Sequence, residues 1–283
     1  MLICIAILSL SLNPIFSHAK DTISWLMRPF PPVFIDDGPE ANKGYGDFLV
    51  NLLIDNLDGY NHLFLKSNVA RSLMLLKTQE KVCNPAILKR PDRESYIEFS
   101  IPAYVLIPNG VIIQKKQLNK FRPYMNNEGL FLLEKAITQS DLKLGISIER
   151  AYGGIIDKIL MENKNHKNFY INYNKEEDHL YKLLQAGRIE YTIAYPMEAQ
   201  YFSKKIENGE NTVSLQVEGM PGYYFGYVGA PKNKWGKEII KKIDAIIEKN
   251  RNTTEYHAAY EYWLDENSIK RYRKYVKAIY GDF

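Results

Sequence analysis

Cysteine is scarce in this sequence, and its scarcity excludes one way of holding a fold together. The chain of 283 residues contains two cysteines, Cys4 and Cys83. Cys4 lies in an N-terminal apolar run of the kind found in export signals, so Cys83 would stand alone in the mature chain. A single thiol cannot build an internal disulfide framework. We therefore expect a hydrophobic core to hold the chain together, with Cys83 as a small buried side chain rather than a reactive thiol.

The sequence also lacks a strong excess of positive or negative charge and the common motifs of catalytic, nucleotide-binding and metal sites. The formal net charge is only +4, and lysines and arginines alternate with acids along the chain. A nucleic-acid binder would show a clustered basic face, so no nucleic-acid partner is expected. The five histidines form no i, i+4 pair with a nearby acid, as zinc helices do. G-x-S-x-G, a phosphate-cradling glycine loop and G-x-G-x-x-G do not occur, and we expect neither a metal nor a cofactor.

Long apolar runs are absent except at the N-terminus. Residues 2–12 are apolar but too few to span a bilayer, and Ser17-His18-Ala19 follows as an A-x-A-like cleavage site. The sequence thus predicts a signal peptide over residues 1–19, cleaved near Ala19 and Lys20. The mature protein would then be periplasmic.

Strand-like and helix-like segments alternate along the mature chain. Hydrophobic residues at 46 % and charged residues at 25 % are ordinary for a soluble globular protein. The alternation runs twice, which favours two α/β lobes, each with a mostly parallel sheet flanked by helices. Strands are predicted at 22–26, 63–65, 142–148, 169–171, 188–195 and 223–229, and helices at 71–80, 130–136, 178–186, 235–249, 255–264 and 269–280, with others starting at an Asp47 N-cap and at Pro196.

An apolar segment at 105–113, broken by Pro108-Asn109-Gly110, is typical of a strand that leaves one lobe and enters another. A first lobe is expected from 20–107, a second from 108–222, and a return to the first lobe over 223–283. The last part contains an amphipathic helix with isoleucines on one side and lysines on the other.

The segment 83–104 concentrates cations between two strand-like runs. Lys89, Arg90 and Arg93 lie there, and Lys81 just precedes them. Cations at a strand-to-helix corner suit an anionic ligand, although charges of this kind are commonly just solvated. Arg150 lies at a second corner of the same type.

These features together resemble the family 3 extracellular solute-binding proteins. The resemblance rests on the spacing from Arg93 to Phe99-Ser100-x-Pro102, the Gly44-Tyr45 turn, the segment 186–190 and the terminal helices. It implies a type 2 periplasmic-binding fold, in which two crossover strands join the lobes and the ligand lies in the cleft. It also implies that Arg93 pairs with a ligand carboxylate and that Phe30 packs on the ligand. Backbone N–H groups of the loop from Arg150 to Tyr152 would add contacts from the second lobe.

Two positions depart from that family's pattern. Arg90 stands where the family has Ser or Thr, and Tyr195 stands where it has an acid that holds the ligand amine. An α-amino acid ligand is therefore in doubt, and a ligand with more negative charge, or an aromatic or polyol-like one met by tyrosines, is favoured. Glu198 could replace the missing acid, or it could simply be a helix N-terminal charge.

Three functions remain open on the sequence. The first is a monomeric binding protein that closes on a small carboxylate for uptake, with an inner-membrane permease as partner. The second is a dehydratase-like enzyme on the same fold acting on a cyclic carboxylic acid, with Glu149, Glu190 or Glu198 as general acid or base. The third is a sensory protein whose closed form docks onto a membrane protein.

Overall fold

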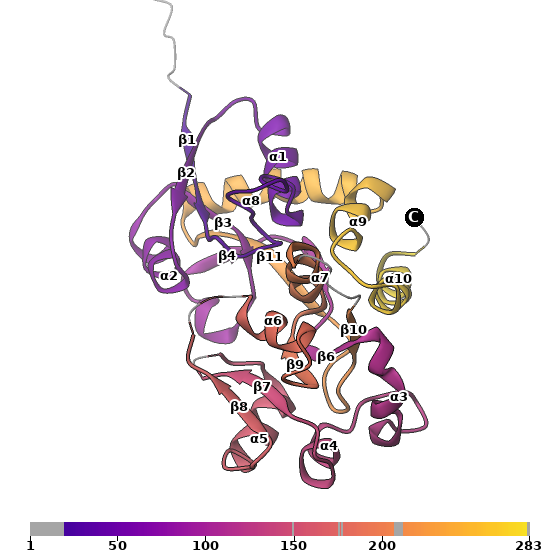
Figure 1. Ribbon diagram of the computed structural model, residues 1–283. Coiled ribbons are helices and arrows are strands. Elements are labelled where there is room, and N and C mark those ends of the chain that lie inside the picture. Colours follow the sequence, from indigo (N-terminus) through magenta and orange to yellow (C-terminus); the bar gives the residue numbers. More distant parts are fainter. Residues whose placement is uncertain (1–19, 149, 175, 177, 207–211, 282–283) are drawn as a thin grey trace, which may run out of the picture.

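A computed structural model describes residues 20–148, 150–174, 176, 178–206 and 212–281. The predicted signal peptide, Glu149 and the last two residues lie outside these ranges. The chain forms two α/β lobes, each built on its own sheet (Figure 1). The predicted two-lobed architecture is confirmed.

The first sheet has the strand order β2-β1-β3-β11-β4, and β5 also pairs with β11. β1 is parallel to both β2 and β3, whereas β11 is antiparallel to β3, β4 and β5. Antiparallel pairing is therefore more extensive than the sequence predicts, because β11 enters this sheet from the second lobe and runs against its neighbours. The strands are β1 (Thr22–Met27), β2 (Asn61–Lys66), β3 (Val82–Ile87), β4 (Ile97–Phe99), β5 (Tyr104–Leu106) and β11 (Tyr224–Pro231).

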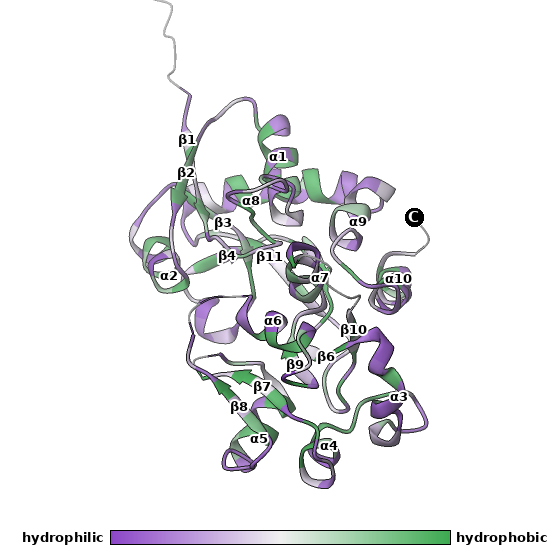
Figure 2. Ribbon diagram, in the orientation of Figure 1, coloured by the Kyte–Doolittle hydropathy of each residue, from purple (hydrophilic) through white to green (hydrophobic). Residues whose placement is uncertain are grey.

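Helices cover the first sheet with the apolar faces that the sequence predicts. The long helix α8 contacts β11 and β4, and the isoleucines predicted to share one face, Ile239 to Ile247, are buried. The green inner faces and purple outer faces of such helices are visible in Figure 2. Cys83 is fully buried, as expected. The helices are α1 (Tyr45–Asn56), α2 (Val69–Thr78), α8 (Lys234–Asn250), α9 (Thr254–Glu261) and α10 (Glu266–Tyr280).

The start of α1 differs from the prediction. Its N-cap is Gly44, and Asp47 lies three residues later, where Oδ2 accepts the N–H groups of Gly44 (3.0 Å) and Ile35 (3.1 Å). A Cβ atom on Gly44 would lie 2.3 Å from the Val33 carbonyl oxygen, so this close turn requires glycine. Asp47 is therefore not the N-cap itself; as the N3 residue it bonds the N–H of the N-cap and also ties the helix to the preceding loop.

The second sheet has the order β10-β6-β9-β7-β8. β7 is parallel to β8 and β9, while β6 is antiparallel to β9 and β10. The segment predicted to leave one lobe for the other does so, since β5 belongs to the first sheet and β6 to the second. The elements of this lobe are β6 (Gly110–Gln114), β7 (Leu144–Ser147), β8 (Phe169–Asn172), β9 (Tyr191–Ala194), β10 (Thr212–Leu215), α3 (Leu118–Phe121), α4 (Leu133–Gln139), α5 (Gly154–Glu162), α6 (His179–Gln185) and α7 (Pro196–Lys205).

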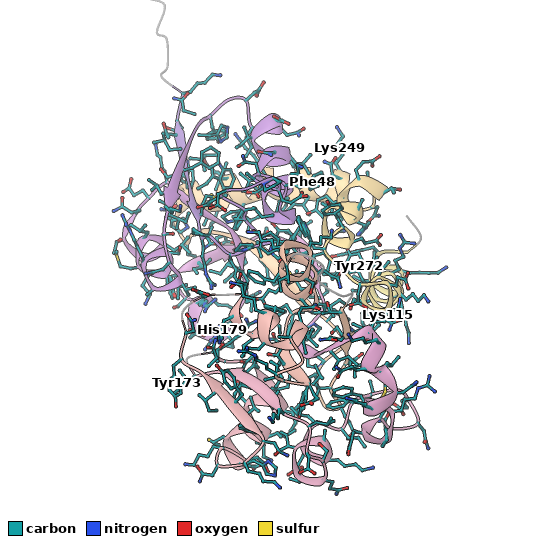
Figure 3. All side chains as sticks on the ribbon, in the orientation of Figure 1. Phe48, Lys115, Tyr173, His179, Lys249 and Tyr272 are labelled. Atoms are coloured by element: carbon teal, nitrogen blue, oxygen red, sulfur yellow. The ribbon has the colours of Figure 1, made fainter. Side chains whose placement is uncertain are left out.

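The two lobes also share part of their core. Tyr201 on α7 and Trp263 after α9 are almost fully buried, with ring centroids 5.6 Å apart. On this side of the molecule the lobes pack together. Figure 3 labels Tyr173, which is 73 % exposed and projects from the edge of the second lobe after β8.

Candidate functional site: the cleft between the lobes

A cavity of about 750 Å³ lies between the two lobes. The first lobe lines it with the loop after β1, the start of α1, the start of α2, the end of β3 and residues of β5 and β11. The second lobe lines it with the loop after β7, the start of α7, Asn174 and Glu176. Its volume falls within the range of about 300–1,000 Å³ that small-ligand sites occupy.

The wall of the first lobe carries an aromatic side chain with a cation above it. Phe30 lines the cavity and packs against the core of the lobe. The Arg28 guanidinium carbon lies 4.5 Å from the centre of the Phe30 ring, a cation–π distance. Phe30, the predicted ligand-packing residue, is thus placed at the cavity.

The wall of the second lobe carries a buried ion pair. Arg150, after β7, donates from Nη1 to Glu198 Oε1 (3.0 Å) and from Nη2 to Oε2 of the same carboxylate. The side chain of Glu198 is 4 % exposed and that of Arg150 is 29 % exposed. Burial works against the charged guanidinium, but the adjacent Glu198 carboxylate raises the pKa of Arg150 above its usual range. Arg150 is therefore a permanent cation matched by a carboxylate of its own lobe.

The ion pair is tied to the start of α7 and to the connection between the lobes. Glu198 Oε2 accepts the N–H of Tyr195, the N-cap residue of α7, at 3.1 Å. Arg150 Nη2 also donates to Asn109 Oδ1 at 3.3 Å, and Asn109 lies between β5 and β6. Glu198 thus acts as the helix N-terminal charge that the sequence allows. Tyr195 lines the cavity as well, and burial raises its pKa.

Tyr152 lies behind this wall. It is 3 % exposed, and its hydroxyl accepts the N–H of Ser147 at 2.9 Å. Its own N–H donates to Asp157 Oδ1 at 2.7 Å, and the Arg150 N–H donates to the Ser147 carbonyl at 3.3 Å. Two backbone groups that the family resemblance assigns to the ligand are therefore engaged within the lobe in this structure.

Arg90 and Arg93 are not among the residues that line the cavity in the described part of the chain. Arg90 is exposed and pairs through Nε with Asp92 at 3.0 Å. Arg93 ends the short 3₁₀ helix η1 (Pro91–Arg93), and its Nη1 donates to the carbonyl of Leu88 at 2.9 Å. Leu88 does line the cavity, so Arg93 is connected to the cavity wall through its hydrogen bond to the Leu88 carbonyl.

The other residues singled out in the sequence are also located. Lys81 and Lys89 are exposed, as expected, and pair with Asp21 and Glu94. Glu190 accepts the N–H of Lys143 at 2.8 Å and is not one of the described cavity residues. Glu149 lies outside the described residues.

Sequence reasoning missed Arg28 and Asn109. Arg28 directly precedes the proline-rich loop that presents Phe30, and this adjacency is the signal that could have identified it. Asn109 sits in the Pro-Asn-Gly break of the crossover segment, where an isolated polar residue between two apolar strands marks a buried hydrogen-bonding role.

The described residues show neither a metal-binding cluster nor a membrane-spanning helix. No group of three or more His, Cys, Asp or Glu side chains in these ranges could hold a metal ion. Likewise, none of the helices within them has the length and apolar character needed to cross a membrane.

Comparison with known protein families and with curated protein sequences found no match to this chain. Comparison with solved structures found many similar folds. The probable amino-acid ABC transporter extracellular-binding protein ytmK from Bacillus subtilis is 17 % identical with a TM-score of 0.65, covering 88 % of this chain and 100 % of that one. A putative L-cystine ABC transporter from Listeria monocytogenes is 21 % identical with a TM-score of 0.57, covering 87 % and 97 %.

A third similar structure is a histidine kinase sensor domain described as similar to periplasmic binding proteins. It is 16 % identical with a TM-score of 0.55, covering 87 % of this chain and 96 % of that one. At sequence identities this low, the similarity establishes the fold alone. The chain therefore has the two-lobed type 2 periplasmic-binding fold that its sequence predicts.

Proposed function

We propose that this protein is a periplasmic solute-binding protein that captures a small carboxylate-bearing ligand between its lobes by hinge closure, for uptake or sensing. The observation that carries this proposal is the cavity between the lobes, lined from both sides and containing two arginines and several aromatic side chains. Phe30, Arg150, Tyr195 and Glu198 are its proposed ligand-facing residues. A monomer with lobes at 20–107, 108–222 and 223–283, exported by a signal peptide over 1–19, fits this proposal.

The similar structures support the same class of function. The one from B. subtilis is described as a probable amino-acid ABC transporter extracellular-binding protein and the one from L. monocytogenes as a putative L-cystine ABC transporter, and another is a histidine kinase sensor domain. An inner-membrane permease or a membrane sensor is accordingly the proposed partner. Closure of two lobes about a hinge is the motion expected of this architecture.

A melting-temperature screen of the purified protein tests the proposal. Ligands should include aliphatic and aromatic carboxylates, dicarboxylates and amino acids. A true ligand at 100 times its Kd should stabilise the protein by about 2.7 kcal/mol through mass action. Small-angle scattering should show a smaller radius of gyration with that ligand. If no compound raises the melting temperature, the proposed function is wrong.

The dehydratase-like alternative gains no support from the site. A general acid or base must be free to exchange a proton with the substrate. The two carboxylates among the described cavity residues are both ion-paired, Glu198 with Arg150 and Glu176 with Lys182. NMR spectra of a bound ligand recovered unchanged after long incubation would agree with binding alone.

A further inference from the structure

Arg28 faces the cavity and has no partner carboxylate among the residues that the structure describes. It lines the cavity and is exposed, and no ion pair to it is found within the described residues. Its guanidinium carbon lies 4.5 Å above the Phe30 ring. A guanidinium that lies over an aromatic face can still offer N–H groups to a carboxylate as a pair of hydrogen bonds. Arg28 is thus positioned to bind an organic anion.

Backbone hydrogen bonds fix the loop that carries Phe30. The Phe30 N–H donates to the Phe34 carbonyl at 3.3 Å, and the Phe34 N–H donates back at 3.2 Å. The Val33 N–H adds a 2.7 Å bond to the Phe30 carbonyl. A loop closed by three hydrogen bonds loses little freedom when a ligand binds, which favours affinity.

On the opposite wall, Glu198 has little capacity left for a ligand amine. Its carboxylate accepts two bonds from Arg150 and one from the Tyr195 N–H, out of about four acceptor positions. It is also almost completely buried. Moving it to a ligand ammonium would leave Arg150 uncompensated, and separating a buried pair in this way is strongly unfavourable.

The other acidic side chain among the described cavity residues lies in solvent. Glu176 is exposed and lies 3.6 Å from the Lys182 ammonium. An α-ammonium group entering the cavity would therefore find the buried Glu198 carboxylate already paired and could reach only the solvent-exposed Glu176, which would compensate poorly for the water it loses. The remaining wall is largely apolar or aromatic, with Val33, Phe34, Tyr104, Leu106 and Met197 among its members.

Resting on the proposed solute-binding function, we infer that the cleft selects a monocarboxylate with an apolar or aromatic body and no α-ammonium group. Arg28, which lies over the Phe30 ring, holds the carboxylate. The Arg150–Glu198 pair remains intact on ligand binding and acts as a filter against zwitterions. Specificity thus comes from the Arg150–Glu198 ion pair, because Glu198 is already neutralised by Arg150 and does not attract a ligand ammonium group.

Calorimetric titration with matched pairs of compounds tests this inference. Each pair consists of an α-amino acid and the acid lacking its amino group: phenylalanine with 3-phenylpropanoate, methionine with 4-(methylthio)butanoate, and leucine with 4-methylpentanoate. We expect the desamino member to bind at least tenfold more tightly in the best-binding pair. Tighter or equal binding of the amino acid overturns the inference and leaves the proposed function standing.

Variants then assign the carboxylate contact. R28Q should weaken binding of the best desamino acid by about 10- to 100-fold, the loss expected for a charge-assisted bidentate contact. The matched control is R71Q, because Arg71 is an exposed arginine of the same lobe outside the described cavity lining. Equal affinities of the two variants overturn the role of Arg28. If no pair binds but another compound raises the melting temperature, the inferred ligand class is wrong and the proposed function survives.

Discussion

Two strand-to-helix corners carry arginines, one in each lobe, and they differ in what holds the guanidinium. At the first-lobe corner, Arg90 pairs with Asp92 in solvent, and Arg93 bonds a backbone carbonyl. At the second-lobe corner, Arg150 is paired with the buried Glu198 and bonded to Asn109. The side chain of Arg90 is 61 % exposed, against 29 % for that of Arg150.

This difference decides whether an arginine at each corner is available to bind a ligand. An exposed ion pair contributes about 0–1 kcal/mol and is easily exchanged for another partner. A buried ion pair is a fixed part of the structure, since removing one partner strands the other. The corner inside the cavity is consequently the less available one, which is why the inferred ligand-binding cation is Arg28 rather than Arg150.

The largest expected effect is the loss of the buried carboxylate. E198Q leaves Arg150 without its counter-charge, so the free energy of unfolding should fall by about 3–5 kcal/mol in urea denaturation. The double variant R150Q/E198Q should recover part of the loss. The control E94Q removes an exposed carboxylate 3.9 Å from Lys89 and should change stability by less than about 0.5 kcal/mol. A loss for E198Q as small as that of E94Q would show that the second corner is as loosely held as the first.

An intermediate effect is expected at Asn109, which fixes the second corner to the connection between lobes. Asn109 is 4 % exposed, donates from Nδ2 to the Tyr152 carbonyl at 2.9 Å and accepts from Arg150. N109A should lower the free energy of unfolding by about 1–3 kcal/mol, because two buried partners lose their hydrogen bonds. N56A, which removes an exposed side-chain bond to the Leu52 carbonyl, is the control. Identical stabilities of N109A and N56A would contradict the anchoring role.

A smaller effect is expected at Arg93. In this structure it supports the Leu88 carbonyl, so R93Q should reduce stability by about 1 kcal/mol and change ligand affinity less than threefold. The carboxylate-binding role implied by the family resemblance instead requires a loss of about tenfold or more. Calorimetric titration of R93Q beside R28Q decides between these roles. A larger loss in R93Q than in R28Q would return the carboxylate site to the first-lobe corner.

Features set by local pattern were predictable from the sequence. The helical spacing of the isoleucines in α8 and the alternation of strands and helices each depend on residues close together in the chain. The proline-rich loop likewise marked Phe30 as a presented aromatic. These local patterns predicted the two lobes and the Phe30 side chain on the first-lobe wall of the cavity.

The partners of charged side chains were not predictable in the same way. Arg150 and Glu198 are 48 residues apart, and only the packing of β7 against β9 brings them together. Long side chains such as those of Arg28 and Arg93 can reach several partners, and tertiary structure selects among them. The prediction of Asp47 as an N-cap is wrong for a related reason. Its carboxylate also accepts a hydrogen bond from the Ile35 N–H, in a loop before the helix, and the local sequence does not reveal this partner.

The smallest effect is expected at Arg90, and it tests the comparison of the two corners most finely. R90Q removes a solvent-exposed pair with Asp92, so stability should change by less than about 0.5 kcal/mol and ligand affinity should not change. D92N is the matched variant, since it breaks the same pair from the other side while keeping the arginine. If R90Q weakens ligand binding several-fold and D92N does not, Arg90 reaches the ligand when the lobes close. Arg90, which stands where the family has Ser or Thr, would then be a specificity residue, because an arginine held only by a surface carboxylate can change partners at little cost.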